Sequence, residues 1–116
     1  MFGVSNLRDA RTELDAWLAR LEQLHPVAIE LGLDRVRRVR DALSLAPRFP
    51  GITVGGTNGK GSTCAYLEAI LGAAGYTTGL YTSPHLVRYN ERVRIGGREV
   101  GDAGLVAAFE QIDAAR

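Results

Sequence analysis

The fold is decided by the stretch Ile52-Thr53-Val54-Gly55-Gly56-Thr57-Asn58-Gly59-Lys60-Gly61-Ser62. Its first three residues are β-branched, which predicts a short buried strand. Glycines follow, and then comes a helical stretch with an apolar face predicted at Ala65, Leu67, Ile70, Leu71 and Ala74. Gly75 is predicted to end this helix, and residues 77–82 to form a second strand. Residues 52–82 therefore predict a strand–loop–helix–strand unit, which normally closes as a right-handed parallel crossover.

Two helices are predicted before this unit. Apolar residues recur at three- and four-residue steps over residues 6–24, which is typical of an amphipathic helix. A second helix is predicted over residues 34–45, with Val36, Val39 and Leu43 facing inward. Pro47 and Pro50 then favour an extended connection to the glycine-rich stretch.

A hairpin and a helix are predicted after the unit. Residues 92–100 contain the pair Gly96-Gly97, which suits a two-residue hairpin turn. A last helix is predicted from Asp102 to the end of the chain. The predicted fold class is α/β, with an incomplete parallel sheet preceded by two helices.

The segment 55–62 has the composition of a phosphate-binding loop. Glycines admit positive φ angles and let backbone N–H groups approach phosphate oxygens. The following helix adds the partial positive charge of its N-terminus. Lys60 is a mobile cation, and a hydroxyl just after it can ligate Mg²⁺. The residues predicted to bind nucleotide are Thr57, Asn58, Gly59, Lys60, Gly61 and Ser62, with Lys60 also in a catalytic role.

The loop departs from the general pattern G-x-x-x-x-G-K-[ST] in two places. That pattern expects glycine at position 54 and a hydroxyl at position 61, where this chain has Val54 and Gly61. The first hydroxyl after the lysine is instead on Ser62. The alternative is a plain glycine-rich turn with a surface lysine. The position between a predicted strand and helix, with hydroxyls following, favours the phosphate site.

Composition and charge argue against several classes of function. The chain has 116 residues, 23% of them charged, with a formal net charge of +1, so no broad basic surface for nucleic acid is expected. The four arginines within residues 35–40 are expected to spread around a solvated helix. No apolar stretch approaches the roughly 20 residues of a membrane span. The single Cys64 fits a reducing compartment. We expect a cytoplasmic protein with neither nucleic-acid nor membrane partners.

Three strings carry a resemblance to a known family. The loop Gly-Thr-Asn-Gly-Lys-Gly-Ser at 56–62 resembles the nucleotide loop of folylpolyglutamate and dihydrofolate synthases, which belong to the Mur-ligase group. The string Tyr-Thr-Ser-Pro-His-Leu-Val-Arg-Tyr-Asn-Glu-Arg at 81–92 resembles the Ser-Pro-His-Leu loop of this folate branch. The string Leu-Gly-Leu-Asp-Arg at 31–35 resembles the segment of that branch that contacts the pterin. The resemblance covers residues 14–113.

The resemblance implies an organisation and a reaction. Residues 1–50 would be a helical segment contributing to the pterin pocket, and residues 51–116 would begin the ATP-binding domain. With ATP and Mg²⁺, the family phosphorylates the carboxylate of dihydropteroate or a folate. The amino group of L-glutamate then attacks the acyl phosphate and an amide forms. The partners would be these small molecules, and the complete ligase is expected to be a monomer.

The resemblance also assigns site residues. Ser83 matches a magnesium-binding serine of the family, and Ser62 is a second candidate for the ion by the logic of phosphate loops. The substrate residues implied for the pterin and its linker are Ala28, Ile29, Glu30, Leu31, Thr82 and His85. Plainer interpretations stand beside these: Ser83-Pro84 is also a sequence that starts turns, and His85 is also an ordinary loop histidine.

Further metal ligands and the glutamate-binding domain of the family would lie beyond residue 116. The chain alone is therefore expected to have no ligase activity. The alternatives are a non-catalytic nucleotide-binding module, a broken gene product, and a Mur ligase that acts on a UDP-linked peptidoglycan precursor. The Ser-Pro-His-Leu string at 83–86 counts against the Mur ligase.

Overall fold

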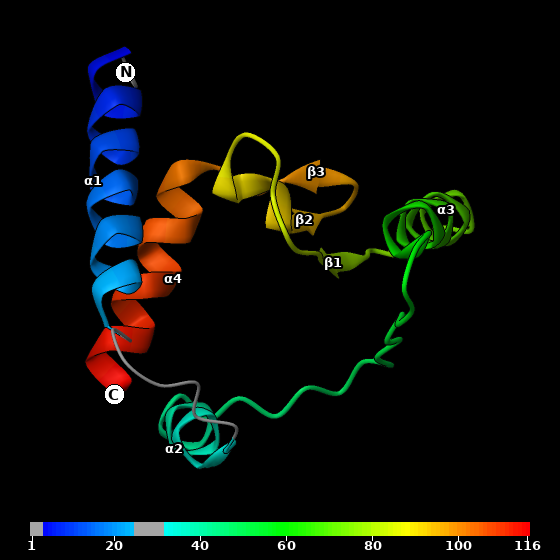
Figure 1. Ribbon diagram of the computed structural model, residues 1–116, viewed down its shortest axis with the longest axis horizontal. Coiled ribbons are helices and arrows are strands. Elements are labelled where there is room, and N and C mark those ends of the chain that lie inside the picture. The colour runs from blue at the N-terminus through cyan, green and yellow to red at the C-terminus, as the bar shows by residue number, and fades with distance from the viewer. Residues whose placement is uncertain (1–3, 25–31) are drawn as a thin grey trace. The chain divides into compact units, whose positions relative to one another are not determined.

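The computed structural model describes residues 4–24 and 32–116. In chain order the elements are α1 (Val4–Gln23), α2 (Asp34–Ala42), α3 (Lys60–Ala73), β1 (Gly79–Tyr81), the 3-10 helix η1 (Tyr89–Arg92), β2 (Val93–Ile95), β3 (Arg98–Glu99) and α4 (Asp102–Ala115). Figure 1 labels the α-helices and the strands. They form two compact units: Met1–Arg48 with Asp102–Arg116, and Phe49–Gly101. The helices and the hairpin expected from the sequence are confirmed.

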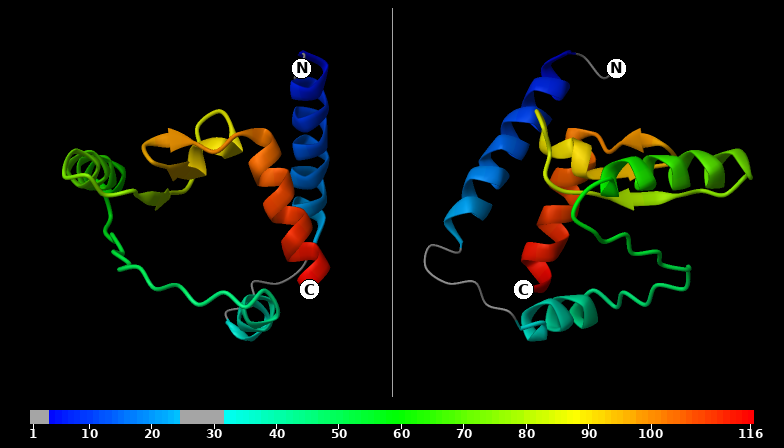
Figure 2. Two further views of the ribbon diagram at one scale, coloured as in Figure 1. Left: turned by 180° about the vertical axis from the view of Figure 1, so that it is seen from behind. Right: turned by 45° about the vertical axis from the view of Figure 1, so that its right-hand side comes forward.

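The helical unit is organised by α1 and α4, which lie side by side in each view of Figures 1 and 2. Their contact buries Leu14 completely and leaves Leu105 and Val106 each 5% exposed. This core follows from the apolar spacing of the two helices, which places one stripe of each toward the other. The rings of Trp17 and Phe109 add an aromatic contact, with centroids 5.9 Å apart.

Ion pairs at both ends of this contact show that the two helices run in the same direction. Arg11 Nη1 lies 3.7 Å from Asp102 Oδ1, and Arg20 Nη2 lies 3.2 Å from Asp113 Oδ1. Because the earlier residue of α1 meets the earlier residue of α4, the helices run parallel. The Arg20 guanidinium also lies 4.8 Å from the centroid of a ring of Trp17, so its stem and head both pack on the interface.

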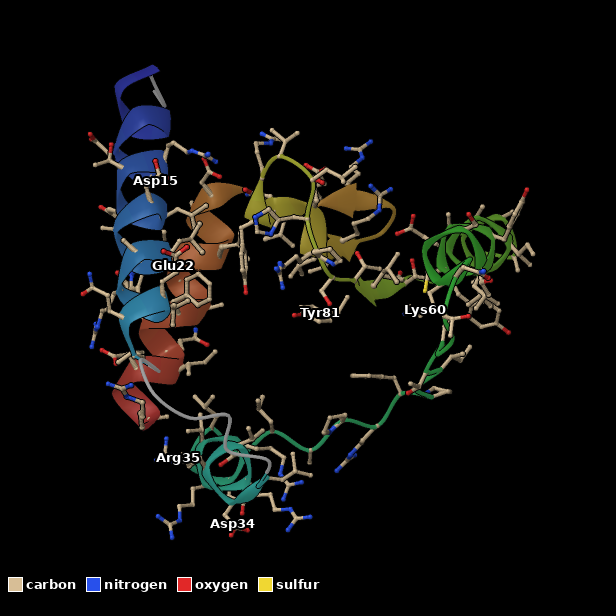
Figure 3. The ribbon with its side chains drawn as sticks, viewed as in Figure 1. Asp15, Glu22, Asp34, Arg35, Lys60 and Tyr81 are labelled. Carbon is tan, nitrogen blue, oxygen red and sulfur yellow. The ribbon has the colours of Figure 1, made fainter. Side chains whose placement is uncertain are left out.

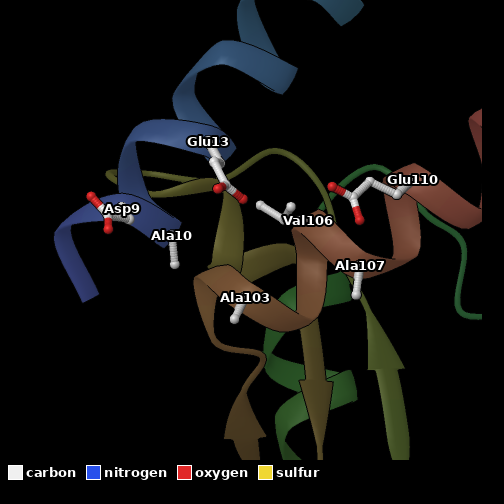
Figure 4. Close-up of a pocket in the computed structure, with 7 residues that line it drawn as sticks. All are labelled: Asp9, Ala10, Glu13, Ala103, Val106, Ala107 and Glu110. Carbon is white, nitrogen blue, oxygen red and sulfur yellow. The ribbon is translucent and has the colours of Figure 1, made fainter. Parts of the chain in front are cut away.

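A shallow groove lies between these two helices. It is lined by Asp9, Ala10, Glu13, Ala103, Val106, Ala107 and Glu110 (Figure 4). The carboxylates of Glu13 and Glu110 flank Val106 in the close-up. The groove belongs to the helical unit, whereas the predicted phosphate loop at 55–62 belongs to the other unit.

In the second unit, α3 ends at the predicted glycine. The N–H of Tyr76 donates to the carbonyl of Leu71 at 3.0 Å, and the N–H of Gly75 donates to the carbonyl of Gly72 at 3.0 Å. Gly75 has a φ of 94°. This pair of bonds is the Schellman arrangement, which satisfies carbonyls that the helix end leaves without intrahelical donors. The predicted stop at Gly75 is confirmed.

The sheet of this unit is antiparallel, in the order β1-β2-β3. Leu80 lies opposite Arg94, and Ile95 lies opposite Arg98. The turn between β2 and β3 has φ angles of 60° at Gly96 and 79° at Gly97. Two positive φ angles match the twist of a tight hairpin and favour glycine at both positions. The hairpin predicted over residues 92–100 is confirmed.

The predicted parallel crossover is not formed within the described residues. Residues 52–54 lie in no strand, Ile52 is 65% exposed, and β1 pairs with β2 rather than with this segment. The β-branched run has strand propensity, but a strand also needs a neighbouring backbone to pair with. Residues 82–92, which include η1, join β1 to β2, and the pairing that forms is antiparallel.

The apolar faces predicted for α2 and α3 are largely exposed. No residue of α3 is buried, with Ile70 63% exposed, while Leu67 and Leu71 are half-buried. Val36 of α2 is 64% exposed. Periodicity thus identified the apolar stripes of both helices, but the described residues do not cover them. Within the same residues, no helix has the length and apolar character needed to cross a membrane.

The compact units divide after Arg48 and again after Gly101. The helix α4 packs with α1 in the helical unit, because Leu105 and Val106 complete the core around Leu14. The pattern within α4 gave no indication of its partner. The functional division into residues 1–50 and 51–116 stays a prediction.

Candidate phosphate and substrate loops

The glycine-rich loop leads directly into α3, whose first residue is Lys60 (labelled in Figure 3). Gly59 is the N-cap, with a φ of 73° in the left-handed region. An L side chain is strained there, so glycine permits the sharp entry of the chain into the helix. The first helical N–H bond runs from Thr63 to the carbonyl of Gly59 at 3.0 Å. The loop and helix junction was correctly placed from the sequence.

The ammonium group of Lys60 is held back over the loop. Its Nζ donates to the carbonyl of Gly56 at 2.6 Å. In an α-helix the N–H groups of the first turn have no carbonyl four residues earlier to bond. The lysine cation and the N–H groups of Lys60, Gly61 and Ser62 therefore share one end of α3. This combination of a cation and free helix-end donors suits an anion such as a phosphate.

Thr63, in the first turn of α3, was not predicted from the sequence to take part in this junction. Its Oγ1 donates to the carbonyl of Gly59 at 2.9 Å, beside the backbone bond between the same two residues. The Thr63 hydroxyl thus reinforces the first turn of α3. Threonine side chains in helices commonly bond the carbonyl four residues earlier, and this tendency could have predicted the contact between Thr63 and Gly59.

The second loop, residues 83–88, is organised by the carboxylate of Glu91. Oε1 accepts from the N–H of Leu86 at 2.9 Å, and Oε2 accepts from Val87 at 2.9 Å and Arg88 at 2.7 Å. These backbone bonds, first that of Arg88, lower the pKa of the Glu91 carboxyl from 4.5 to about 2. Arg88 in turn pairs with Glu99 at 2.8 Å. A single ionised side chain thus holds three consecutive residues of the loop.

The predicted substrate residues Thr82 and His85 both meet Arg92. The N–H of Thr82 donates to the Arg92 carbonyl at 2.9 Å, and the Nε of Arg92 donates to Nδ1 of His85 at 2.8 Å. The ring centroids of His85 and Tyr89 lie 5.7 Å apart, and the Arg92 guanidinium lies 5.1 Å from the Tyr89 centroid. Glu91 and Arg92 lie within the string at 81–92, but nothing in the sequence pattern marks their roles in this loop.

The remaining predicted residues are less constrained. Ala28, Ile29, Glu30 and Leu31 lie outside the described residues. Ser62 and Ser83 are both exposed, and no described hydrogen bond joins the phosphate loop to the second loop. The Ser83-Pro84 peptide is cis.

Hydroxyl oxygens are chemically suitable ligands for Mg²⁺, which commonly keeps several waters and takes few protein ligands. The described residues hold no group of three or more His, Cys, Asp or Glu side chains suited to a metal. In the unit that carries both loops, the carboxylates of Glu68, Glu91 and Glu99 are engaged by Arg94, by backbone amides and by Arg88. The hydroxyls of Ser62 and Ser83 stay the predicted ligands for an ion at these loops.

Comparisons with known proteins place the chain. No family model matches it. The dihydrofolate synthase/folylpolyglutamate synthase of Escherichia coli (strain K12) is 51% identical over 108 residues, which are 92% of this chain and 26% of the relative. The Haemophilus influenzae protein of the same description is 50% identical over 105 residues, 90% of this chain and 24% of the relative. The chain thus spans about a quarter of the length of these curated relatives.

Solved structures of synthases of this kind also match the chain. A bifunctional folylpolyglutamate synthase/dihydrofolate synthase from Yersinia pestis CO92 matches with a TM-score of 0.81 and 55% identity, over 91% of this chain and 26% of that chain. E. coli FolC in complex with DHPP and ADP matches with a TM-score of 0.82 and 50% identity, over 91% of this chain and 26% of that chain. Mycobacterium tuberculosis folylpolyglutamate synthase complexed with ADP matches with a TM-score of 0.82 and 32% identity, over 91% of this chain and 23% of that chain.

The fold and the loop leading into α3 therefore define part of a Mur-ligase-type ATP-binding domain. Within that class, the chain corresponds to the N-terminal part of the dihydrofolate synthase/folylpolyglutamate synthase family. The resemblance carried by the strings at 56–62 and 81–92 is confirmed.

Proposed function

We propose that the chain provides the phosphate-binding loop and a substrate loop of an ATP-dependent ligase that joins L-glutamate to dihydropteroate, to a folate, or to both. The observation that carries the proposal is the junction at Gly59 and Lys60. There the left-handed cap, the folded-back ammonium and the N-terminus of α3 lie together, which supports binding of an anion at this end of the helix.

The chemistry that this position would support is transfer of the γ-phosphate of ATP to a carboxylate. ADP leaves, and the amino group of glutamate displaces phosphate from the acyl phosphate to form the amide. Lys60 would neutralise charge on the phosphates, and the N–H groups of residues 57–62 would hold them in line. The lysine already lies at the loop, so little reorganisation would be needed when nucleotide binds.

The serines would complete the nucleotide site. Ser62, in the first turn of α3, and Ser83, after β1, would hold Mg²⁺, which when bound stabilises negative charge on the phosphate oxygens. Thr82 and His85 would contact the folate-type substrate. Ala28, Ile29, Glu30 and Leu31 stay proposed for the pterin pocket. ADP in the E. coli and M. tuberculosis structures, and AMPPNP with Mn in a Y. pestis structure, support a nucleotide and a divalent ion.

The nucleotide half of the proposal is tested by calorimetric titration of residues 1–116 with ADP and Mg²⁺. Lys60→Ala should weaken binding about ten- to a hundredfold, the effect of losing one hydrogen bond from a charged group. The matched control is Arg38→Ala, which removes the same charge from an exposed position of α2. Equal affinities in the Lys60→Ala protein and the wild type would refute the phosphate loop.

The ligase half is tested by a chimera. Residues 1–116 would replace the matched quarter of the E. coli relative, and amide formation would be measured with dihydropteroate, tetrahydrofolate and a UDP-linked peptidoglycan precursor. Turnover with a folate-type substrate is expected, while residues 1–116 alone should give none. A chimera that binds ADP but forms no amide would favour the non-catalytic module. Turnover of the UDP-linked precursor would favour the Mur ligase.

A further inference from the structure

The loop at residues 83–88 is held by polar bonds rather than by burial. Leu86 is 91% exposed and Val87 is 82% exposed, so apolar packing does not fix this part of the chain. Their backbone N–H groups, and that of Arg88, instead converge on the Glu91 carboxylate. An ionised acceptor makes stronger bonds than a neutral one. The conformation of the loop therefore depends on one side chain of η1.

The neighbouring residue of η1 fixes the imidazole of His85. A guanidinium has N–H donors and no acceptor, so the bond from Arg92 Nε to Nδ1 requires Nδ1 to be the acceptor. The neutral ring must then carry its proton on Nε2. The contacts among Tyr89, His85 and Arg92 also restrict rotation of the ring. Within the described residues, no hydrogen bond is formed at Nε2, so this N–H can serve a ligand.

We propose that Glu91 and Arg92 are positioning residues for the substrate loop. Glu91 fixes the backbone of residues 86–88, and Arg92, by bonding Nδ1, presents the Nε2–H of His85 to the folate-type substrate as a donor to a carbonyl or carboxylate oxygen. The identity of that substrate rests on the proposed function. The arrangement of the loop itself does not, so the two are tested separately.

Hydrogen exchange of the ¹⁵N-labelled chain tests the Glu91 part. Glu91→Gln should reduce protection of the Leu86, Val87 and Arg88 amides about tenfold or more, because a charged acceptor is lost. The internal reference is the amide of Gly96, which bonds the Thr78 carbonyl at 2.8 Å and should not change. The matched control is Glu99→Gln, which removes a carboxylate that bonds the Arg88 side chain but no loop amide.

Two outcomes would overturn this part. Unchanged protection at the three amides in Glu91→Gln would show that the carboxylate does not hold the loop. An equal loss of protection at Gly96 would show a general effect on folding rather than positioning.

Long-range ¹H–¹⁵N spectra of the imidazole rings, at about pH 8.5 where histidine is neutral, test the Arg92 part. The chain has two histidines, so the spectrum of His85→Gln assigns the signals. His85 should show a protonated Nε2. Arg92→Gln retains an N–H donor and should keep that pattern, whereas Arg92→Glu offers only an acceptor and should move the proton to Nδ1. An Nδ1–H pattern in the wild type, or an unchanged Nε2–H pattern in Arg92→Glu, would refute the assignment.

The link to substrate is tested in the chimera. Arg92→Glu should raise KM for the folate-type substrate about tenfold or more and leave KM for ATP unchanged, since a purely structural defect would affect both. Arg92→Gln should largely restore the KM. A parallel rise of both KM values would refute the positioning role. If the wild-type chimera forms no amide, the proposed function fails, and the exchange and imidazole data still decide whether η1 positions the loop.

Discussion

Arg94 of β2 donates from Nε to both carboxylate oxygens of Glu68 of α3, at 3.1 and 3.0 Å. The hydrogen bond with Glu68 is the main reason that the pKa of the Arg94 guanidinium is raised above its ordinary value. The Glu68 side chain is 14% exposed and that of Arg94 is 33% exposed. Because no residue of α3 is buried, this ion pair is a principal tie between the helix that begins with Lys60 and the sheet.

Removing that tie should destabilise the second unit. Glu68→Gln leaves the partly buried Arg94 without its carboxylate, and we expect a loss of about 1–2 kcal/mol in the free energy of unfolding. Urea denaturation followed by circular dichroism measures it. The control is Arg37→Met, which removes an ion pair with Asp34 whose side chains are 62% and 86% exposed. Exposed pairs contribute little, so the control should change stability by less than about 0.5 kcal/mol. Equal effects of the two substitutions would contradict this account.

Two glycines of the phosphate loop should respond to alanine in opposite directions. Gly59→Ala places a Cβ at a φ of 73° and should cost about 1–2 kcal/mol of stability. Gly61 lies inside α3, and a Cβ added there would meet no heavy atom within 4 Å, so Gly61→Ala should stabilise by about 0.5–1 kcal/mol.

Nucleotide affinity distinguishes a glycine needed for the backbone conformation from a glycine needed for close approach of a phosphate. If the backbone at residue 61 approaches phosphate closely, the more stable Gly61→Ala protein should nevertheless bind ADP more weakly. Thermal unfolding and calorimetric titration of the two variants, side by side with the wild type, make the comparison. Undiminished ADP binding by Gly61→Ala would argue against close approach at that residue.

The Glu91 carboxylate should make stability depend on acid pH. Its pKa is about 2 in the folded chain against an ordinary value of 4.5, so the folded state favours the ionised form. The stabilisation is complete above about pH 4.5 and is lost as the pH falls toward 2. Glu91→Gln should therefore melt at a lower temperature than the wild type at pH 7, and the two melting temperatures should converge below about pH 3. A difference that is constant across this range would contradict the assignment.

The core between α1 and α4 should be sensitive to its central residue. Leu14 is fully buried, so Leu14→Ala should cost about 2–5 kcal/mol. Leu24, at 37% exposure, makes the matched control, and its change to alanine should cost less than about 1 kcal/mol. Trp17 is the single tryptophan and lies in this interface, so its fluorescence reports unfolding of the helical unit. Similar losses in the two variants would show that the interface is not the core of this unit.

Local features of the fold were predictable because their signals are local. The helix stop at Gly75, the Gly96-Gly97 turn and the loop before Lys60 each depend on residues within a few positions. Partner choice was not predictable in this way. Nothing within residues 102–115 indicates α1 as a neighbour, and nothing within residues 52–54 indicates that its backbone lies unpaired.

In the candidate site, too, local features were predictable from the sequence and contacts between separate residues were not. Lys60 and the residues around it follow from composition and position alone, since a glycine-rich loop before a helix has few other uses. His85 was placed by resemblance, but its orientation depends on Arg92, and that contact requires the turn of η1 between them. No periodicity marks Glu91 as the acceptor for three amides. Such contacts arise from the path of an irregular loop, which propensity does not encode.

The parallel pairing of α1 with α4 also has a consequence for biosynthesis. Arg20 and Asp113, which pair across the two helices, are 93 positions apart in sequence. On the ribosome, α1 emerges early, yet Leu14 cannot be covered until Leu105 and Val106 have been translated and have left the exit tunnel. Contacts this distant in sequence form late, and an apolar helix stripe left open in the meantime is a target for chaperones and for aggregation. The nascent protein therefore stays vulnerable until α4 is made.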